Sequence, residues 1–136
     1  MRVVTSEQAR IRDELIHRRM QTPEQATAAV LANFRCEYCD LDFLDAQHPD
    51  NYHQWVGWDH LIPRWHGGGD AGDNLVCSCR VCNWIKHRWN PRTAFKGRSN
   101  PPSRDEMIKA ARDYINNKKA KYDREVSQAW RDIVRK

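Results

Sequence analysis

The sequence predicts an α+β fold in which a small strand-and-helix unit is flanked by helices on both sides. Amphipathic helical patterns occupy both ends of the 136-residue chain. Between them lie two short strand patterns and a short helix, bracketed by two Cys-x-x-Cys pairs. We expect a single domain at this length, with N-terminal helices in residues 1–35, the central unit in 36–90, and a basic connector and long helix in 91–136.

The N-terminal part is expected to form two helices. Residues 6–20 carry apolar side chains on one side of a helical pattern and charges elsewhere. Thr22 then suits an N-cap, Pro23 the first helical position, and Gln25 completes a capping box. A second helix over 23–34 would therefore lead directly into the first cysteine pair.

The central unit alternates short elements with turns. Polar and apolar residues alternate over 53–61, which predicts a strand, and residues 75–77 predict a second one. A glycine-rich loop separates the two. A short helix over 82–89 should end before Pro91, since the residue preceding a proline disfavours helix.

The C-terminal part reads as one long helix. Ser103 and Glu106 form another capping box, so a helix should start there and reach about residue 134. The polar run 116–119 interrupts its apolar stripe, and a bend is expected at that point.

Charge and hydropathy point to a protein without a membrane partner. Charged residues make up 30% of the chain, and no apolar run approaches the ~20 residues of a spanning helix. The sequence begins without the apolar core of a signal peptide, so we expect a cytoplasmic protein. The 23 basic residues exceed the 18 acidic ones, for a net charge of +5.

Basic residues are concentrated after residue 84, where they alternate with aromatic ones. This mixture suits a nucleic-acid backbone with bases or sugars beside it, and a solvated basic face is the alternative. The candidate DNA contacts are Lys86, Arg88, Arg92, Lys96 and Arg98. The tryptophans at 55, 58, 65 and 84 are interpreted more simply, as packing residues at the core and its rim.

The chain has five cysteines. In a reducing compartment, paired Cys-x-x-Cys motifs are typical of zinc sites rather than of disulfides. Cys36, Cys39, Cys79 and Cys82 are therefore the predicted ligands of one structural zinc ion, whose four thiolates leave no open coordination position. Cys77 is left over and is expected to be a small buried residue.

The segment between the cysteine pairs carries an ordered set of motifs. It reads Asp59-His60-x-x-Pro63, then three consecutive glycines, then Asn74-Leu75, and finally Cys82-Asn83-x-x-Lys86. This set resembles the zinc-knuckle-bearing HNH endonucleases, over Cys36 to about His87. The resemblance implies a ββα-metal unit that cleaves DNA in a bacterial or phage-like context, and it leaves the flanking helices unassigned.

The resemblance also implies roles for individual residues, and their chemistry agrees. His60 corresponds to the general base, and an imidazole can accept a proton near neutrality. Asn74 corresponds to the residue that orients this base. Asp59 and Asn83 correspond to ligands of a divalent ion, and their oxygens suit Mg²⁺ or Mn²⁺. His87, four residues after Asn83, is either a further ligand on the same helix face or a surface histidine.

The predicted function is metal-dependent hydrolysis of DNA, expected to be double-stranded, with 5′-phosphate and 3′-hydroxyl ends. A non-catalytic zinc-knuckle module that binds nucleic acid is the alternative. That alternative explains the cysteines and the basic segment, but it does not explain why Asp59, His60, Asn74 and Asn83 occur together. A homodimer and a larger specificity partner are both open at this point. The C-terminal helix is either a dimer surface or packs back on the core of its own chain.

Overall fold

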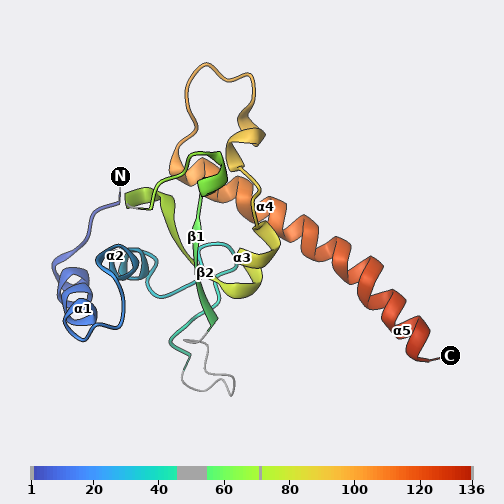
Figure 1. The fold of residues 1–136 in the computed structure, drawn as a ribbon, viewed down its shortest axis with the longest axis horizontal. Helices are drawn as coiled ribbons and strands as arrows, with labels where there is room; N and C mark the ends of the chain where they lie inside the picture. The colour runs from blue at the N-terminus through green and yellow to red at the C-terminus, as the bar shows by residue number, and fades with distance from the viewer. Residues whose placement is uncertain (1, 46–54, 71, 136) are drawn as a thin grey trace.

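A ββα unit forms the centre of the computed structural model, which describes residues 2–45, 55–70 and 72–135 (Figure 1). Strands β1 (Val56–His60) and β2 (Leu75–Cys79) pair antiparallel, with Val56 opposite Cys79 and His60 opposite Leu75. Helix α3 (Arg80–Lys86) follows β2 directly and packs against both strands. Both predicted strands and the short helix are confirmed, with α3 starting and ending earlier than expected; residues 53 and 54 of the first strand lie outside the described part.

Among the residues that the structure describes, 3₁₀ turns connect the elements of this unit. They are η2 (Arg64–His66), η3 (Gly72–Asn74) and η4 (Pro91–Phe95). The first two lie in the loop between the strands, and the third follows α3. These turns lie in the segments that follow β1 and α3, and those two elements carry polar residues of the central motifs.

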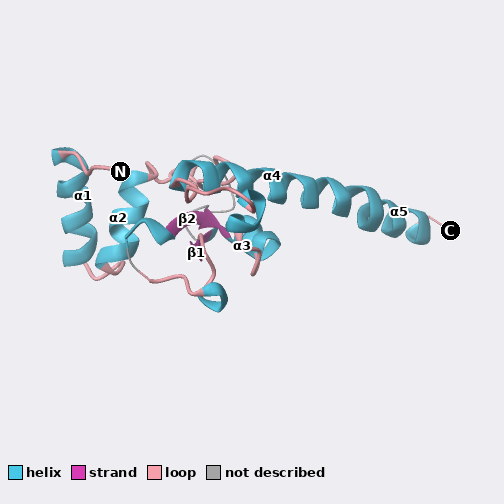
Figure 2. Cartoon of the chain, turned by 90° about the horizontal axis from the view of Figure 1, so that it is seen from above, coloured by secondary structure: helices cyan, strands magenta, loops and turns pink. Residues whose placement is uncertain are grey.

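The N-terminal helices α1 (Ser6–His17) and α2 (Pro23–Leu31) form one flank of the fold (Figure 2). The predicted capping box is confirmed, because the Thr22 hydroxyl accepts from the Gln25 N–H at 3.2 Å. Both helices end about three residues earlier than expected. Helix α2 packs on β2 and buries Ala26 and Val30, whereas α1 packs outside α2 and has no buried residue.

The C-terminal helix α4 (Arg104–Tyr122) forms the opposite flank and begins at the predicted capping box of Ser103 and Glu106. Its first half buries Ala111 and Ile115 in the core. At 116–119 the helix is not interrupted and continues to Tyr122, where a π-helical turn, η5 (Asp123–Ser127), leads into α5 (Gln128–Val134). This end projects away from the body (Figures 1 and 2).

The core lies between β2, α3 and α4 and includes the buried cysteines, Leu61, Val76 and Ile85. Trp55 and Trp58 are partly buried against it, as packing residues should be. Within the described ranges, none of the helices has the length and apolar character needed to cross a bilayer.

Candidate metal and catalytic site

Four cysteine side chains converge at the junction of two elements. The Sγ atoms of Cys36, Cys39, Cys79 and Cys82 all lie within 4.8 Å of one another. The first pair lies on a tight turn closed by the Asp40 N–H, which donates to the Cys36 carbonyl at 2.8 Å. In the second pair, Cys79 caps α3 through its Sγ, which accepts from the Cys82 N–H at 3.3 Å. This set of four sulfur donors fits zinc.

The four thiols of the sulfur cluster are coupled: the pKa values of Cys39 and Cys79 are lowered and those of Cys36 and Cys82 are raised, because the thiols hydrogen-bond to one another. The Cys36 thiol is hydrogen-bonded to Cys39 and lowers the pKa of Cys39 to about 6. The Lys119 ammonium, on α4, donates to the Cys82 Sγ at 3.6 Å. Although partial burial acts in the opposite direction, the charges of Cys82 and Cys39 raise the pKa of Lys119. Cys77 lies outside the cluster, and its burial raises the pKa of this thiol to about 12, so its interpretation as a buried residue is confirmed.

A cleft of about 320 Å³ opens between the end of β1, η2 and α3. Its lining includes four of the residues predicted for catalysis or metal binding: Asp59, His60, Asn83 and His87. The complete lining adds Trp58, Pro63, Arg64, Trp65 and Arg88. The fold thus brings residues from two ends of the central segment into one depression.

His60 is the last residue of β1, and a carboxylate orients its ring. The His60 Nε2 lies 2.9 Å from Oδ1 of Asp70. In the tautomer that donates from Nε2, Nδ1 is left as the proton acceptor. The Arg64 guanidinium, together with His60, holds the pKa of Asp70 below its usual range, so this carboxyl stays ionised. Sequence reasoning missed Asp70; its only signal was a carboxylate directly after the glycines.

Asn74 holds the loop that follows His60. Its side-chain oxygen accepts from the Ile62 N–H at 2.8 Å, and its Nδ2 donates to the carbonyls of Ile62, at 3.0 Å, and Gly69, at 2.8 Å. The backbone passes so closely at Gly68 that a Cβ there would lie 1.7 Å from the Ile62 carbonyl oxygen. Asn74 does not line the cleft. This is the geometry that an orienting role requires.

Asp59 is 5% exposed and is held by two buried partners. Its Oδ2 accepts from the Tyr38 hydroxyl at 2.6 Å and lies 3.0 Å from the Lys86 Nζ. Tyr38 lies between the two cysteines of the first pair, so this bond links the sulfur cluster to the cleft. Sequence reasoning missed Tyr38 as well, although an aromatic residue inside a Cys-x-x-Cys pair was visible.

Lys86 is not a DNA contact. Its side chain is fully buried, and its ammonium also donates to the His60 carbonyl at 3.0 Å. Burial lowers the pKa of Lys86, and the Asp59 carboxylate acts in the opposite direction. The prediction of a phosphate contact was wrong because Lys86 lies one helical turn after Cys82, on the inner side of α3.

Asn83 and His87 reach the cleft in different ways. Asn83 follows Cys82 on α3, and Gly57 of β1 makes room for it, since a Cβ at Gly57 would lie 3.0 Å from the Asn83 Nδ2. His87 is not part of the helix, contrary to expectation. It is the C-cap, with φ 49° and ψ −119°, although its N–H still donates to the Asn83 carbonyl at 2.9 Å.

The remaining basic candidates differ in their position. Arg88 lines the cleft, and its guanidinium stacks 4.6 Å from the centre of the Trp65 ring. Arg92 and Lys96 are exposed in and after η4. Arg98 pairs with Glu106 and stacks over Phe95. These three lie on the connector before α4 and do not line the cleft.

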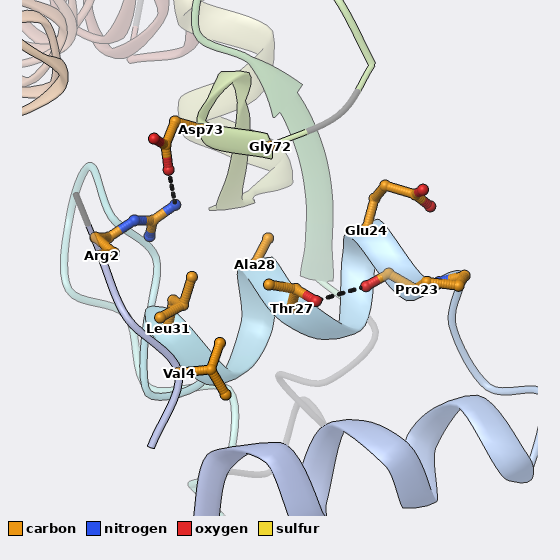
Figure 3. A pocket seen from close by; sticks show the side chains of 9 residues that line it. All are labelled: Arg2, Val4, Pro23, Glu24, Thr27, Ala28, Leu31, Gly72 and Asp73. Atoms are coloured by element: carbon orange, nitrogen blue, oxygen red, sulfur yellow. Dashed lines mark hydrogen bonds and ion pairs between the residues drawn. The ribbon is translucent and has the colours of Figure 1, made fainter. Parts of the chain in front are cut away.

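A second depression, of about 460 Å³, lies between the N-terminal segment, α2 and η3 (Figure 3). Arg2 and Asp73 in its lining lie 3.9 Å apart and pair with each other, and the Thr27 hydroxyl donates to the Pro23 carbonyl. No residue predicted for catalysis or metal binding lines it. This depression lies where the N-terminal segment meets the central unit. Unlike the cleft at His60, it does not bring together groups suited to catalysis or metal binding.

Comparison with known proteins gives one match. Residues 36–88 match the family model described as HNH endonuclease. No curated protein and no solved structure matches the chain. The matched segment contains both cysteine pairs and every residue predicted for catalysis or metal binding, and it leaves out the helices on either side.

Proposed function

We propose that this protein is a metal-dependent endonuclease that hydrolyses DNA phosphodiester bonds. The observation that supports the proposal most is the shared cleft of Asp59, His60, Asn83 and His87, inside the segment that matches the HNH family model. A carboxylate, an amide and two imidazoles in one depression can supply a general base and ligands for a divalent ion, which together can hydrolyse a phosphodiester.

His60 is the proposed general base. Its Nδ1 takes a proton from water while Nε2 donates to Asp70, which keeps the ring in one orientation. Asn74 fixes the loop that follows His60 through its bonds to Ile62 and Gly69. This keeps the His60 imidazole oriented towards the cleft. The resulting hydroxide attacks phosphorus as the P–O3′ bond breaks. The departing 3′-oxygen takes a proton from solvent, which gives 5′-phosphate and 3′-hydroxyl ends.

Asp59 and Asn83, with His87 as the third candidate, are the proposed ligands of Mg²⁺ or Mn²⁺. Their oxygen donors suit a hard cation. When bound, such an ion supplies Lewis-acid stabilisation of the departing 3′-oxygen. Tyr38 and Lys86 orient the Asp59 carboxylate through Oδ2, which leaves Oδ1 as the atom offered to the ion.

The four cysteines have a separate, structural role in this proposal. They would bind zinc with all four positions filled by sulfur, so no position is open to water or substrate. Zinc then holds the Cys36–Cys39 turn against the start of α3, and Tyr38 transmits that position to Asp59.

The proposal is tested by incubating supercoiled plasmid with the purified protein. We expect nicked circles with Mg²⁺ or Mn²⁺, none with EDTA, and 5′-phosphate ends on mapping. One cleft per chain should cut one strand at a time, so nicks should precede linear product. Binding of DNA without any metal-dependent nicking would instead favour the non-catalytic zinc-knuckle module.

A further inference from the structure

Two tryptophans near the cleft are exposed where packing residues would be buried. Trp65 is 73% exposed and Trp84 is 69% exposed. Neither ring is therefore part of the core, although packing at the core and its rim was predicted for both. Large aromatic side chains left in solvent beside a functional cleft mark candidate contact surfaces.

Trp65 is held in place before any ligand arrives. It lies at the centre of η2, where the His66 N–H donates to the Pro63 carbonyl at 2.8 Å and the Gly68 N–H donates to the same carbonyl at 3.0 Å. The Arg88 guanidinium stacks over the ring. The ring is thus oriented by a hydrogen-bonded turn and by a cation, and most of its surface remains open.

Trp84 lies on the other side of the end of α3. It lines another cleft, of about 380 Å³, which shares His87 and Arg88 with the cleft that Asp59 and His60 line. Trp84 contacts Tyr122 in this cleft, with ring centres 6.0 Å apart. Lys118 lines it as well, and its ammonium lies 5.6 Å from the centre of the Tyr114 ring. Aromatic and basic side chains therefore line both clefts, which meet at His87.

We infer that Trp65 and Trp84 are stacking platforms for unpaired nucleobases on the two sides of the cleaved phosphate. This inference rests on the proposed function and names its substrate class: single-stranded nucleic acid, or duplex with unpaired nucleotides at the cut. Bases inside a duplex already stack on their neighbours, so they cannot lie on a protein ring without being flipped out. Unpaired bases have open faces, and neighbouring Arg88 and Lys118 provide charges for their phosphates.

The inference is tested by equilibrium binding of the His60→Ala protein, which separates binding from cleavage. A fluorescent single-stranded oligonucleotide is compared with the same strand in a duplex. We expect the single strand to bind more tightly. Trp65→Ala and Trp84→Ala should each weaken single-strand binding by about tenfold and leave duplex binding nearly unchanged. Trp65→Phe should retain most of the affinity, because it keeps a stacking face.

Trp130→Ala is the matched control, since Trp130 is also 69% exposed but lies on α5, outside both clefts. It should bind both oligonucleotides as the parent does. A strand carrying 2-aminopurine gives a direct readout, because stacking quenches this base and Trp65→Ala should relieve the quenching. Tighter binding of the duplex, or equal losses on both substrates, would overturn the inference. A protein that binds single strands in this way but cuts no substrate would fail the proposed function alone.

Discussion

Asp59 illustrates how one carboxylate is prepared for an ion by its neighbours. The hydroxyl of Tyr38 and the ammonium of Lys86 both contact the same oxygen, Oδ2. A buried carboxylate without such partners would shift towards its neutral form. The buried lysine therefore has a positioning role, and it also holds the backbone of His60 through its carbonyl.

His87 has a backbone conformation that residues with a side chain rarely adopt. Its φ of 49° lies in the left-handed region, which favours glycine. Strain of this kind costs on the order of 1–3 kcal/mol and tends to persist where a side chain is needed. A histidine side chain that lines the cleft gives a reason for keeping it.

We therefore predict that His87→Gly is more stable than His87→Ala by about 1 kcal/mol, because glycine tolerates this φ and alanine does not. Urea unfolding of the two variants measures the difference. Both variants should bind Mn²⁺ more weakly than the parent if the imidazole is a ligand. Equal stabilities would mean that the left-handed conformation is not kept in solution.

The grouping of Asp59, His60 and Asn83 in one cleft could be predicted from the ordered motif set that runs from Asp59 to Lys86. The surroundings of each residue could not. Whether Lys86 faces solvent or core depends on the phase of a helix only seven residues long, and an exposed basic run was the simpler interpretation. Asp70 and Tyr38 were missed because their contacts cross loops that sequence periodicity does not describe.

At the scale of elements, the starts of the helices were more predictable than their ends. Capping boxes at Thr22 and Ser103 have clear sequence patterns, and both are confirmed. No comparable pattern marks where α1 and α2 stop, and Pro91 sets only an outer limit for α3, which ends at Lys86. The end of α3 matters most, because it places His87 outside the helix and changes how this residue reaches Asn83.

The four sulfur atoms bring the turn at Cys36–Cys39 together with the start of helix α3, and we predict that removing zinc loosens this junction. The purified chain should contain about one zinc ion that resists mild EDTA. Strong denaturing chelation, or Cys79→Ser, should remove the zinc and lower the thermal midpoint sharply. Cys77→Ala is the control: it lies outside the cluster and should keep the zinc content. A folded Cys79→Ser protein with normal zinc would refute the four-cysteine site.

For the molecule as a whole, the two flanks differ in how closely they are tied to the central unit. Helix α2 and the first half of α4 pack against β2 and α3. No described residue after Ile115 is buried, and α5 exposes Trp130 and Ile133. Self-association through this exposed face stays a prediction. The cleft belongs to the central unit. The residues that line it lie on β1, η2 and α3 or immediately beside these elements in the sequence.

The cleft is proposed to hydrolyse DNA with His60 as the general base. A comparison of two histidine variants tests this proposal most directly. His60→Ala should lower the rate of metal-dependent plasmid nicking by at least about a hundredfold, the usual contribution of a general base, while DNA binding is retained. His66→Ala changes an exposed histidine of the same loop, one that does not line the cleft, and should nick like the parent. A His60→Ala protein that nicks at the parental rate would contradict the account.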